Sequence, residues 1–149
     1  MTFKKYILSF IALALIATLP GCYSPKIFLS EEEQRFADSL AKVYSADVNL
    51  QHDYKAIKGN RKDGHFWVEV KNARYQNFCS ADSLLIKGIA SDIAKCLVKT
   101  MKYKPNYSSI EIVFVNSEFT DKQTESTVCE KRLAVDIKNP GTAEITYWH

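Results

Sequence analysis

The sequence has little glycine or proline and lacks the motifs by which common enzymes are recognised. Its 149 residues include five glycines and four prolines. They form neither a glycine-rich phosphate loop nor a Gly-x-Ser-x-Gly nucleophile turn. No pair of carboxylates stands alone in an apolar stretch, the setting that acid–base catalysis favours. The chain also has no internal repeat and no low-complexity segment. These absences favour a non-enzymatic domain that binds no cofactor.

No sign of charge dominates the sequence. Lysine and arginine contribute 20 residues and aspartate and glutamate 17, a net charge of +3 that falls to +1 when Lys4 and Lys5 are set aside. Nucleic-acid binding requires a concentrated basic surface, so the balanced charges exclude nucleic acid as an expected partner. The densest basic cluster consists of Lys58, Arg61 and Lys62. A solvated turn explains it better than an anion site.

The longest hydrophobic run lies at the N-terminus. Lys4 and Lys5 precede an uncharged, mostly apolar run from Tyr6 to Leu19. A positively charged start followed by such a run is typical of a secretory signal. The run is shorter than the ~20 residues that a membrane-spanning helix needs, so a signal explains it better than a transmembrane anchor.

The signal ends in the sequence Leu19-Pro20-Gly21-Cys22. This motif resembles the lipobox of bacterial lipoprotein precursors. Leu19, Gly21 and Cys22 match the lipobox, and Pro20 stands where alanine or serine is usual. The resemblance implies that signal peptidase II cleaves before Cys22 and that the new N-terminus is acylated. It concerns the targeting class alone and carries no information on the fold of the remaining chain.

The resemblance together with the length and pattern of the remaining sequence predicts how the chain is organised. Residues 1–21 would be the removed signal peptide and residues 22–29 a lipidated linker. Residues 30–149 would form a single α+β domain, a length that suits one hydrophobic core. The protein would reside in the bacterial cell envelope, attached to the inner or the outer membrane through its lipid.

The pattern of the remaining sequence predicts two helices and five strands in the order α-β-β-α-β-β-β. Helical periodicity covers residues 31–45 and 81–102. Alternation of apolar and polar residues predicts strands over 48–56, 66–71, 110–115, 128–137 and 143–148, the first two forming a hairpin. Residues 116–126 are polar without periodicity and are expected to form a loop. Short connections favour antiparallel pairing, and we expect a two-layer α+β sandwich with an antiparallel sheet.

Local signals support both helices. Ser30 and Glu33 form a capping box for the first, and Ser80 is the expected cap of the second. An apolar stripe along the second helix should face the core and consists of Ile86, Ile89, Ile93, Cys96, Leu97 and Met101.

Three cysteines remain once Cys22 is assigned to the lipid. Cys79 precedes the second predicted helix and Cys96 lies within it, 17 residues further along. At 1.5 Å per residue they stand about 25 Å apart, too far for a disulfide. Cys96 on the apolar stripe and Cys129 on the inner face of its strand are expected to meet in the core, as a disulfide or as two buried thiols. Cys79 precedes a helix N-terminus and is the best candidate for a reactive thiol, although an inert role is favoured.

A metal site built from His52, Asp53 and His65 would require the first hairpin to align them. Their spacing matches no specific metal-binding motif. Two histidines in strands are more often ordinary surface residues, so no metal site is expected.

The aromatic residues provide the clearest candidate surface. Alternation places Trp67 opposite Phe66 and Val68, and places Trp148 opposite Ile145 and Tyr147. Val113 and Val115 also lie on the minority face of their strand. If the helices cover one face of the sheet, the other would present an interaction surface formed by Trp67, Trp148, Val113 and Val115. The alternative is that the first helix covers it.

These observations favour a lipid-anchored envelope protein that binds another envelope protein or a small ligand. The first alternative is a small envelope enzyme, hydrolytic or thiol-dependent, that uses Cys79 or a histidine. The second is an immunity-type lipoprotein that neutralises a toxin at the membrane.

Lipidation at Cys22 is the first testable prediction. Acylation of both the thiol and the new amino group supplies more than one chain, enough for stable anchoring. We expect Cys22→Ala to leave the precursor uncleaved or to release the protein from the membrane fraction, as measured by fractionation and intact mass. Mature protein that kept the acyl mass after this substitution would contradict the assignment.

Overall fold

The computed structural model of the chain describes residues 26–120 and 124–149, so the predicted signal peptide and Cys22 lie outside the described residues. The described part contains one five-stranded sheet and three α-helices. The predicted α+β class and the five strands are confirmed. In chain order the elements are α2 Glu31–Tyr44, β1 Asp47–Gln51, α3 Tyr54–Lys58, β2 Gly64–Lys71, α4 Ser83–Leu97, a 3₁₀ turn Lys104–Asn106, β3 Tyr107–Phe119, β4 Glu125–Asp136 and β5 Ala143–Trp148.

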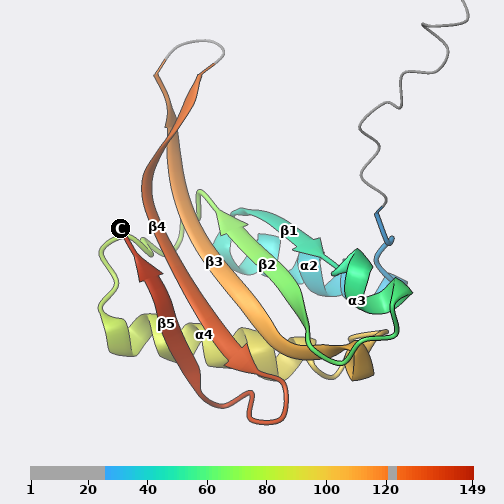
Figure 1. Cartoon of the computed structure of the whole chain (residues 1–149). Coiled ribbons are helices and arrows are strands. Elements are labelled where there is room, and N and C mark those ends of the chain that lie inside the picture. Colours follow the sequence, from blue (N-terminus) through green and yellow to red (C-terminus); the bar gives the residue numbers. More distant parts are fainter. Residues whose placement is uncertain (1–25, 121–123) are drawn as a thin grey trace, which may run out of the picture.

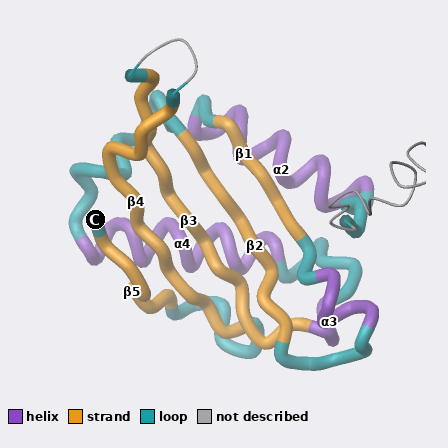
Figure 2. The backbone as a smooth tube through the Cα atoms, turned by 45° about the horizontal axis from the view of Figure 1, so that its top comes forward, coloured by secondary structure: helices purple, strands orange, loops and turns teal. Residues whose placement is uncertain are grey.

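The sheet is mixed, and the antiparallel prediction is wrong for one pair of strands. The strands lie side by side in the order β1-β2-β3-β4-β5. β2 and β3 are parallel, whereas the other neighbouring pairs are antiparallel. The connection between β2 and β3 carries α4, and a crossover of that length returns the chain to the same end of the sheet. The sheet does not close, so β1 and β5 form its edges (Figure 2).

A third helix interrupts the segment that alternation predicted as strand 48–56. β1 ends at Gln51, and Asp53 caps α3 by accepting a hydrogen bond from the backbone N–H of Ala56 at 3.0 Å. Ala56 is buried in α3, as it would be in a strand, so the pattern of apolar residues did not distinguish the helix from a longer strand. The expected direct hairpin is therefore an antiparallel pair joined through a helical turn.

The loop expected over residues 116–126 is largely strand. β3 and β4 pair as far as Phe119 and Glu125, and the resulting ribbon projects beyond the rest of the sheet (Figure 1). Polar side chains stabilise its base: the Lys71 Nζ lies 2.7 Å from a carboxylate oxygen of Glu125, and the Ser117 hydroxyl bonds the other oxygen. A two-stranded ribbon surrounded by solvent has no apolar face, so no hydrophobic alternation marks it.

Helices α2 and α4 lie behind the sheet in both views, on the same face (Figures 1 and 2). The predicted capping box of α2 is present, with Ser30 and Glu33 bonded reciprocally. Asp82 rather than Ser80 caps α4, its carboxylate accepting from the Leu85 N–H at 2.8 Å. The core between helices and sheet includes Ala37, Leu40, Phe66, Val68, Val70, Ile86, Ile93, Leu97, Ile110, Ile112, Phe114, Leu133 and Val135.

The buried face of α4 differs in one respect from the predicted stripe. Ile86, Ala90, Ile93 and Leu97 are buried at helical spacing, whereas Cys96 is exposed. Helix α4 also ends at Leu97, five residues before the predicted end. Among the described helices none is both long and apolar enough to span a bilayer.

Helix α4 offers one buried and one exposed aliphatic residue for a matched pair of substitutions. Ile93 is 3% exposed, whereas Leu84 on the same helix is 82% exposed. We expect Ile93→Ala to lower the free energy of unfolding by about 2–5 kcal/mol through lost burial and a residual cavity. Leu84→Ala should change it by less than about 0.5 kcal/mol. Equal losses in denaturant titration would mean that the buried face of α4 is wrongly assigned.

Candidate functional site

The sheet face turned away from α2 and α4 carries the candidate site. Strand alternation and the observed register place Trp67, Glu111 and Arg132 on this face, opposite the core residues. We call it the open face, because no described helix lies over it (Figure 2). Trp67 is half-buried and Tyr147 is 48% exposed.

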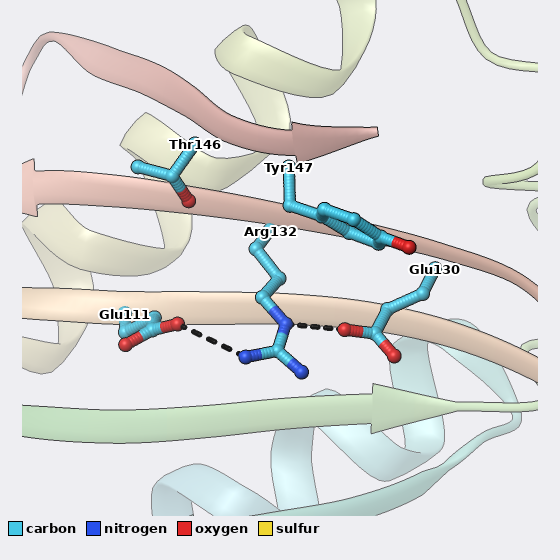
Figure 3. A pocket seen from close by; sticks show the side chains of 5 residues that line it. All are labelled: Glu111, Glu130, Arg132, Thr146 and Tyr147. Atoms are coloured by element: carbon cyan, nitrogen blue, oxygen red, sulfur yellow. Dashed lines mark hydrogen bonds and ion pairs between the residues drawn. The ribbon is translucent and has the colours of Figure 1, made fainter. Parts of the chain in front are cut away.

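Arg132 on β4 lies between Glu111 and Glu130 on the open face (Figure 3). Its guanidinium donates to Glu130 and lies 3.8 Å from a carboxylate oxygen of Glu111. It also lies 5.5 Å from the Trp67 ring centroid and 5.9 Å from that of Tyr147. The hydrogen bond to Glu130, helped by the charges of Glu130 and Glu111, raises the pKa of Arg132. The cation is therefore held by two carboxylates and two aromatic rings.

A hollow of about 510 Å³ lies beside this arginine and is lined by Glu111, Glu130, Arg132, Thr146 and Tyr147 (Figure 3). Three strands contribute to it, so the sheet backbone fixes the positions of the lining side chains. The charged side chains of the hollow are two carboxylates and one guanidinium, so the lining carries one net negative charge beside an aromatic ring, which favours a cationic group.

The two predicted valines contribute less to this surface than expected. Val113 is 1% exposed and Val115 is half-buried. Arg132 on β4 reaches the Trp67 ring on β2, so its side chain crosses over β3, where Val113 lies. Val113 is buried on the open face and is not part of the main core cluster.

Trp148 lies on the opposite face from the one predicted. The register between β4 and β5 shifts between Arg132 and Leu133, so Arg132 faces Tyr147 whereas Leu133 faces Ile145. The shift is a β-bulge on β5, and one extra residue reverses the alternation beyond it. Tyr147 therefore joins the open face and Trp148 joins the helix-covered side. Alternation in the sequence alone carried no sign of this bulge.

Trp148 belongs to a second cation site, around Lys131. The Lys131 ammonium lies 3.7 Å from the Trp148 ring centroid. Lys131 is 1% exposed. The ammonium donates to the carbonyl oxygens of Phe78, Cys79 and Ala81 at 2.7, 3.0 and 2.7 Å. Burial lowers the pKa of Lys131. Its three N–H donors are all used within the protein, so this lysine ties the segment before α4 to β4 rather than offering a charge to a ligand.

The disulfide differs from the predicted pair. Cys129 bonds Cys79, with Cα atoms 6.0 Å apart, and Cys96 is a free, exposed thiol. The prediction of Cys96 with Cys129 is wrong because Cys96 lies off the buried stripe of α4. Cys129 does lie on the inner side of β4, as expected, and the segment held by Lys131 brings Cys79 to it. Cys79 is thus not a free thiol in this structure.

His52 and His65 do not form one site. His52 is buried, whereas His65 lies on the open face with Nδ1 2.6 Å from the Ser109 hydroxyl. Within residues 26–120 and 124–149, no cluster of three His, Cys, Asp or Glu side chains is arranged to hold a metal ion.

His52 instead joins a buried network that the sequence did not reveal. Its Nδ1 lies 2.6 Å from the Tyr107 hydroxyl, and its Nε2 lies 3.2 Å from Glu33 Oε2. Glu33 also accepts from the backbone N–H groups of Ser30 and Lys102, at 2.7 and 3.0 Å. Burial alone would raise the pKa of Glu33, but the hydrogen bonds from His52, Ser30 and Lys102 outweigh it and lower the pKa to about 2.

This network joins α2, β3, the segment after β1 and the segment after α4. Burial, reinforced by the charge of Glu33, raises the pKa of Tyr107, so the hydroxyl stays protonated. Both the Glu33 and the His52 side chains are fully buried. The network is sealed from solvent and acts as a structural connection, whereas the open face is accessible.

The open face is also strongly acidic. Register and hydrogen bonding place seven carboxylates and two basic side chains of the described residues on it. The sequence as a whole has 17 acidic and 20 basic residues, so the acidic groups are concentrated on this face and the basic groups are depleted. The acidic residues are Asp47, Glu69, Glu111, Glu125, Glu130, Asp136 and Glu144, and the basic residues are Lys71 and Arg132.

The buried network predicts a pH-dependent contribution to stability. The pKa of Glu33 is about 2 in the folded protein against an ordinary value of 4.5. Its stabilising effect is therefore present above pH 4.5 and is lost as the pH falls towards 2. We expect Glu33→Gln to lower the free energy of unfolding at pH 7 by about 1–3 kcal/mol, since a buried donor loses its acceptor. The difference from wild type should shrink between pH 4.5 and 2.

Glu32→Gln on the same helix is the control, because its side chain is 61% exposed. It should leave the pH profile of stability unchanged in denaturant titrations. A difference in stability between wild type and the Glu33→Gln variant that stayed constant down to pH 2 would contradict the described network.

No family model matches the sequence, and comparison with curated proteins and with solved structures finds no match. The geometry of the open face is therefore the basis for a functional proposal.

Proposed function

We propose that this protein is a lipid-anchored component of the bacterial envelope that binds a partner protein through its open face. The observation that carries the proposal is that helices cover one face of the sheet and leave the other uncovered. Helices α2 and α4 lie on one face, whereas the other presents Trp67, Arg132 and Tyr147 without a covering helix. In this proposal the fold is a two-layer sandwich whose second sheet face is kept for binding.

The composition of the open face supports a protein partner. Aromatic residues and arginine are enriched in the centres of protein interfaces, and Trp67, Arg132 and Tyr147 lie together here. Their positions are set by three different strands, so the surface is preorganised and loses little conformational entropy on binding.

The Leu19-Pro20-Gly21-Cys22 motif supports the anchoring part of the proposal. Lipidation at Cys22 would leave residues 23–29 between the lipid and the N-terminal cap of α2. The disulfide between Cys79 and Cys129 fits an oxidising compartment outside the cytoplasm. The roles of small envelope enzyme and immunity-type lipoprotein have no specific observation in their favour.

A crosslinking experiment in the producing cells tests the proposal. A photoreactive residue replaces either His65, which is exposed on the open face, or Lys87, which is exposed on α4 on the other side. We expect a discrete covalent adduct from position 65 and none from position 87. Tyr147→Ala should abolish the adduct from position 65, because it removes one of the aromatic side chains that the proposed interface contains.

Leu84→Ala is the matched control, since it also truncates an exposed apolar side chain but lies on α4. It should leave the adduct unchanged. Equal crosslinking from positions 65 and 87, or an adduct that survives Tyr147→Ala, would argue against the open face as the binding surface.

A further inference from the structure

We infer that the partner presents a basic surface to the open face, with a lysine or arginine side chain entering the hollow beside Tyr147. This inference rests on the proposed function and adds the chemistry of the partner. It is carried by the charge distribution on the open face together with the composition of the hollow.

The open face has seven acidic and two basic side chains, an excess of five negative charges at neutral pH. It holds seven of the 17 acidic residues of the sequence and two of the 20 basic ones. The remainder of the protein is correspondingly basic. Such an asymmetry produces a directional field that attracts one class of partner and repels the other.

The two basic residues of the open face are already occupied. Lys71 is 2.7 Å from Glu125, and Arg132 is held by Glu111 and Glu130. Neither cation is therefore poised to bind a phosphate or carboxylate of a ligand. An anionic partner would have to separate these pairs and approach five excess negative charges.

The same charges argue against three other occupants. A second copy of this chain placed face to face would bring two negative surfaces together, and like charges across an interface are unfavourable. Nucleic acid and anionic lipid headgroups would meet the same repulsion. A basic polypeptide surface is the remaining complementary occupant.

The hollow has the groups that a cationic side chain would use. Glu111 and Glu130 lie on either side of Arg132, and the Tyr147 ring lies above them at the edge of the hollow (Figure 3). Glu111 and Glu130 are 30% and 20% exposed, so both side chains remain accessible. Glu130 is hydrogen-bonded to Arg132, whereas Glu111 lies 3.8 Å from it, beyond hydrogen-bond distance. An incoming ammonium or guanidinium would therefore pair with Glu111 while stacking on the tyrosine ring.

Peptide binding to the purified full-length lipoprotein in non-ionic detergent tests the inference. The probe is a fluorescent twelve-residue peptide in which glycine alternates with lysine and arginine. The counter-probe alternates glycine with glutamate and aspartate. Fluorescence anisotropy at low ionic strength should show binding of the basic peptide alone, and added salt should weaken it because exposed charges are screened.

Two triple variants separate the open face from general charge. Glu69→Gln, Glu111→Gln and Glu144→Gln together lower the excess of the open face from five negative charges to two. Glu31→Gln, Glu32→Gln and Asp38→Asn remove the same number of charges from exposed residues of α2. We expect the first set to lower affinity for the basic peptide about tenfold, as for the loss of three exposed ion pairs. The second set should change affinity less than about twofold, because its charges lie on the other side of the sheet.

Failure of this inference is distinguishable from failure of the proposed function. No binding of the basic peptide, or equal losses in both triple variants, would overturn the basic partner. If the open-face triple variant still gave the position-65 adduct in cells at the wild-type level, the open face would bind a partner of other chemistry. In that case the proposed function would stand and this inference would not.

Discussion

The parallel pairing of β2 with β3 is the constraint on which the rest of the structure depends. Two parallel neighbours need a crossover connection, and here that connection contains α4. Once α4 packs on one face beside α2, every strand contributes its core residues to that side. The chain has no third long helix in its described part to cover the opposite face. The open face is thus a consequence of topology as well as of surface composition.

Two consecutive cations on β4, Lys131 and Arg132, point to opposite faces of the sheet and have different surroundings. Lys131 points to the helix-covered side, where three backbone carbonyl groups and the Trp148 ring surround it. Arg132 points to the open face, where Glu111 and Glu130 hold it. A buried charge is tolerated only when its donors are fully used, which Lys131 satisfies with backbone groups. The adjacent disulfide at Cys129 strengthens the same connection between β4 and the segment before α4.

The buried network around Glu33 also joins distant segments of the chain, here around the start of α2. The carboxylate caps the first turn of α2 and at the same time accepts from His52 and from the backbone of Lys102. One side chain thereby joins residues that are 69 positions apart in the sequence. Because α2 follows the N-terminal segment, this network connects the helix nearest the proposed anchor to the sheet. The open face lies on the side of the sheet away from α2, free of that connection.

The sequence by itself determined the class of the domain and most of its elements, because these depend on local periodicity and capping. The capping box of Ser30 and Glu33, the inner residues of β2 and β4, and the position of Trp67 on the minority face all follow from such patterns. Only the tertiary structure decided the parallel pair, the Cys79–Cys129 disulfide, the buried Glu33–His52–Tyr107 network and the exchange of Trp148 for Tyr147 on the open face. Each of these depends on which distant segments meet, or on a single-residue bulge that reverses alternation without any signal in composition.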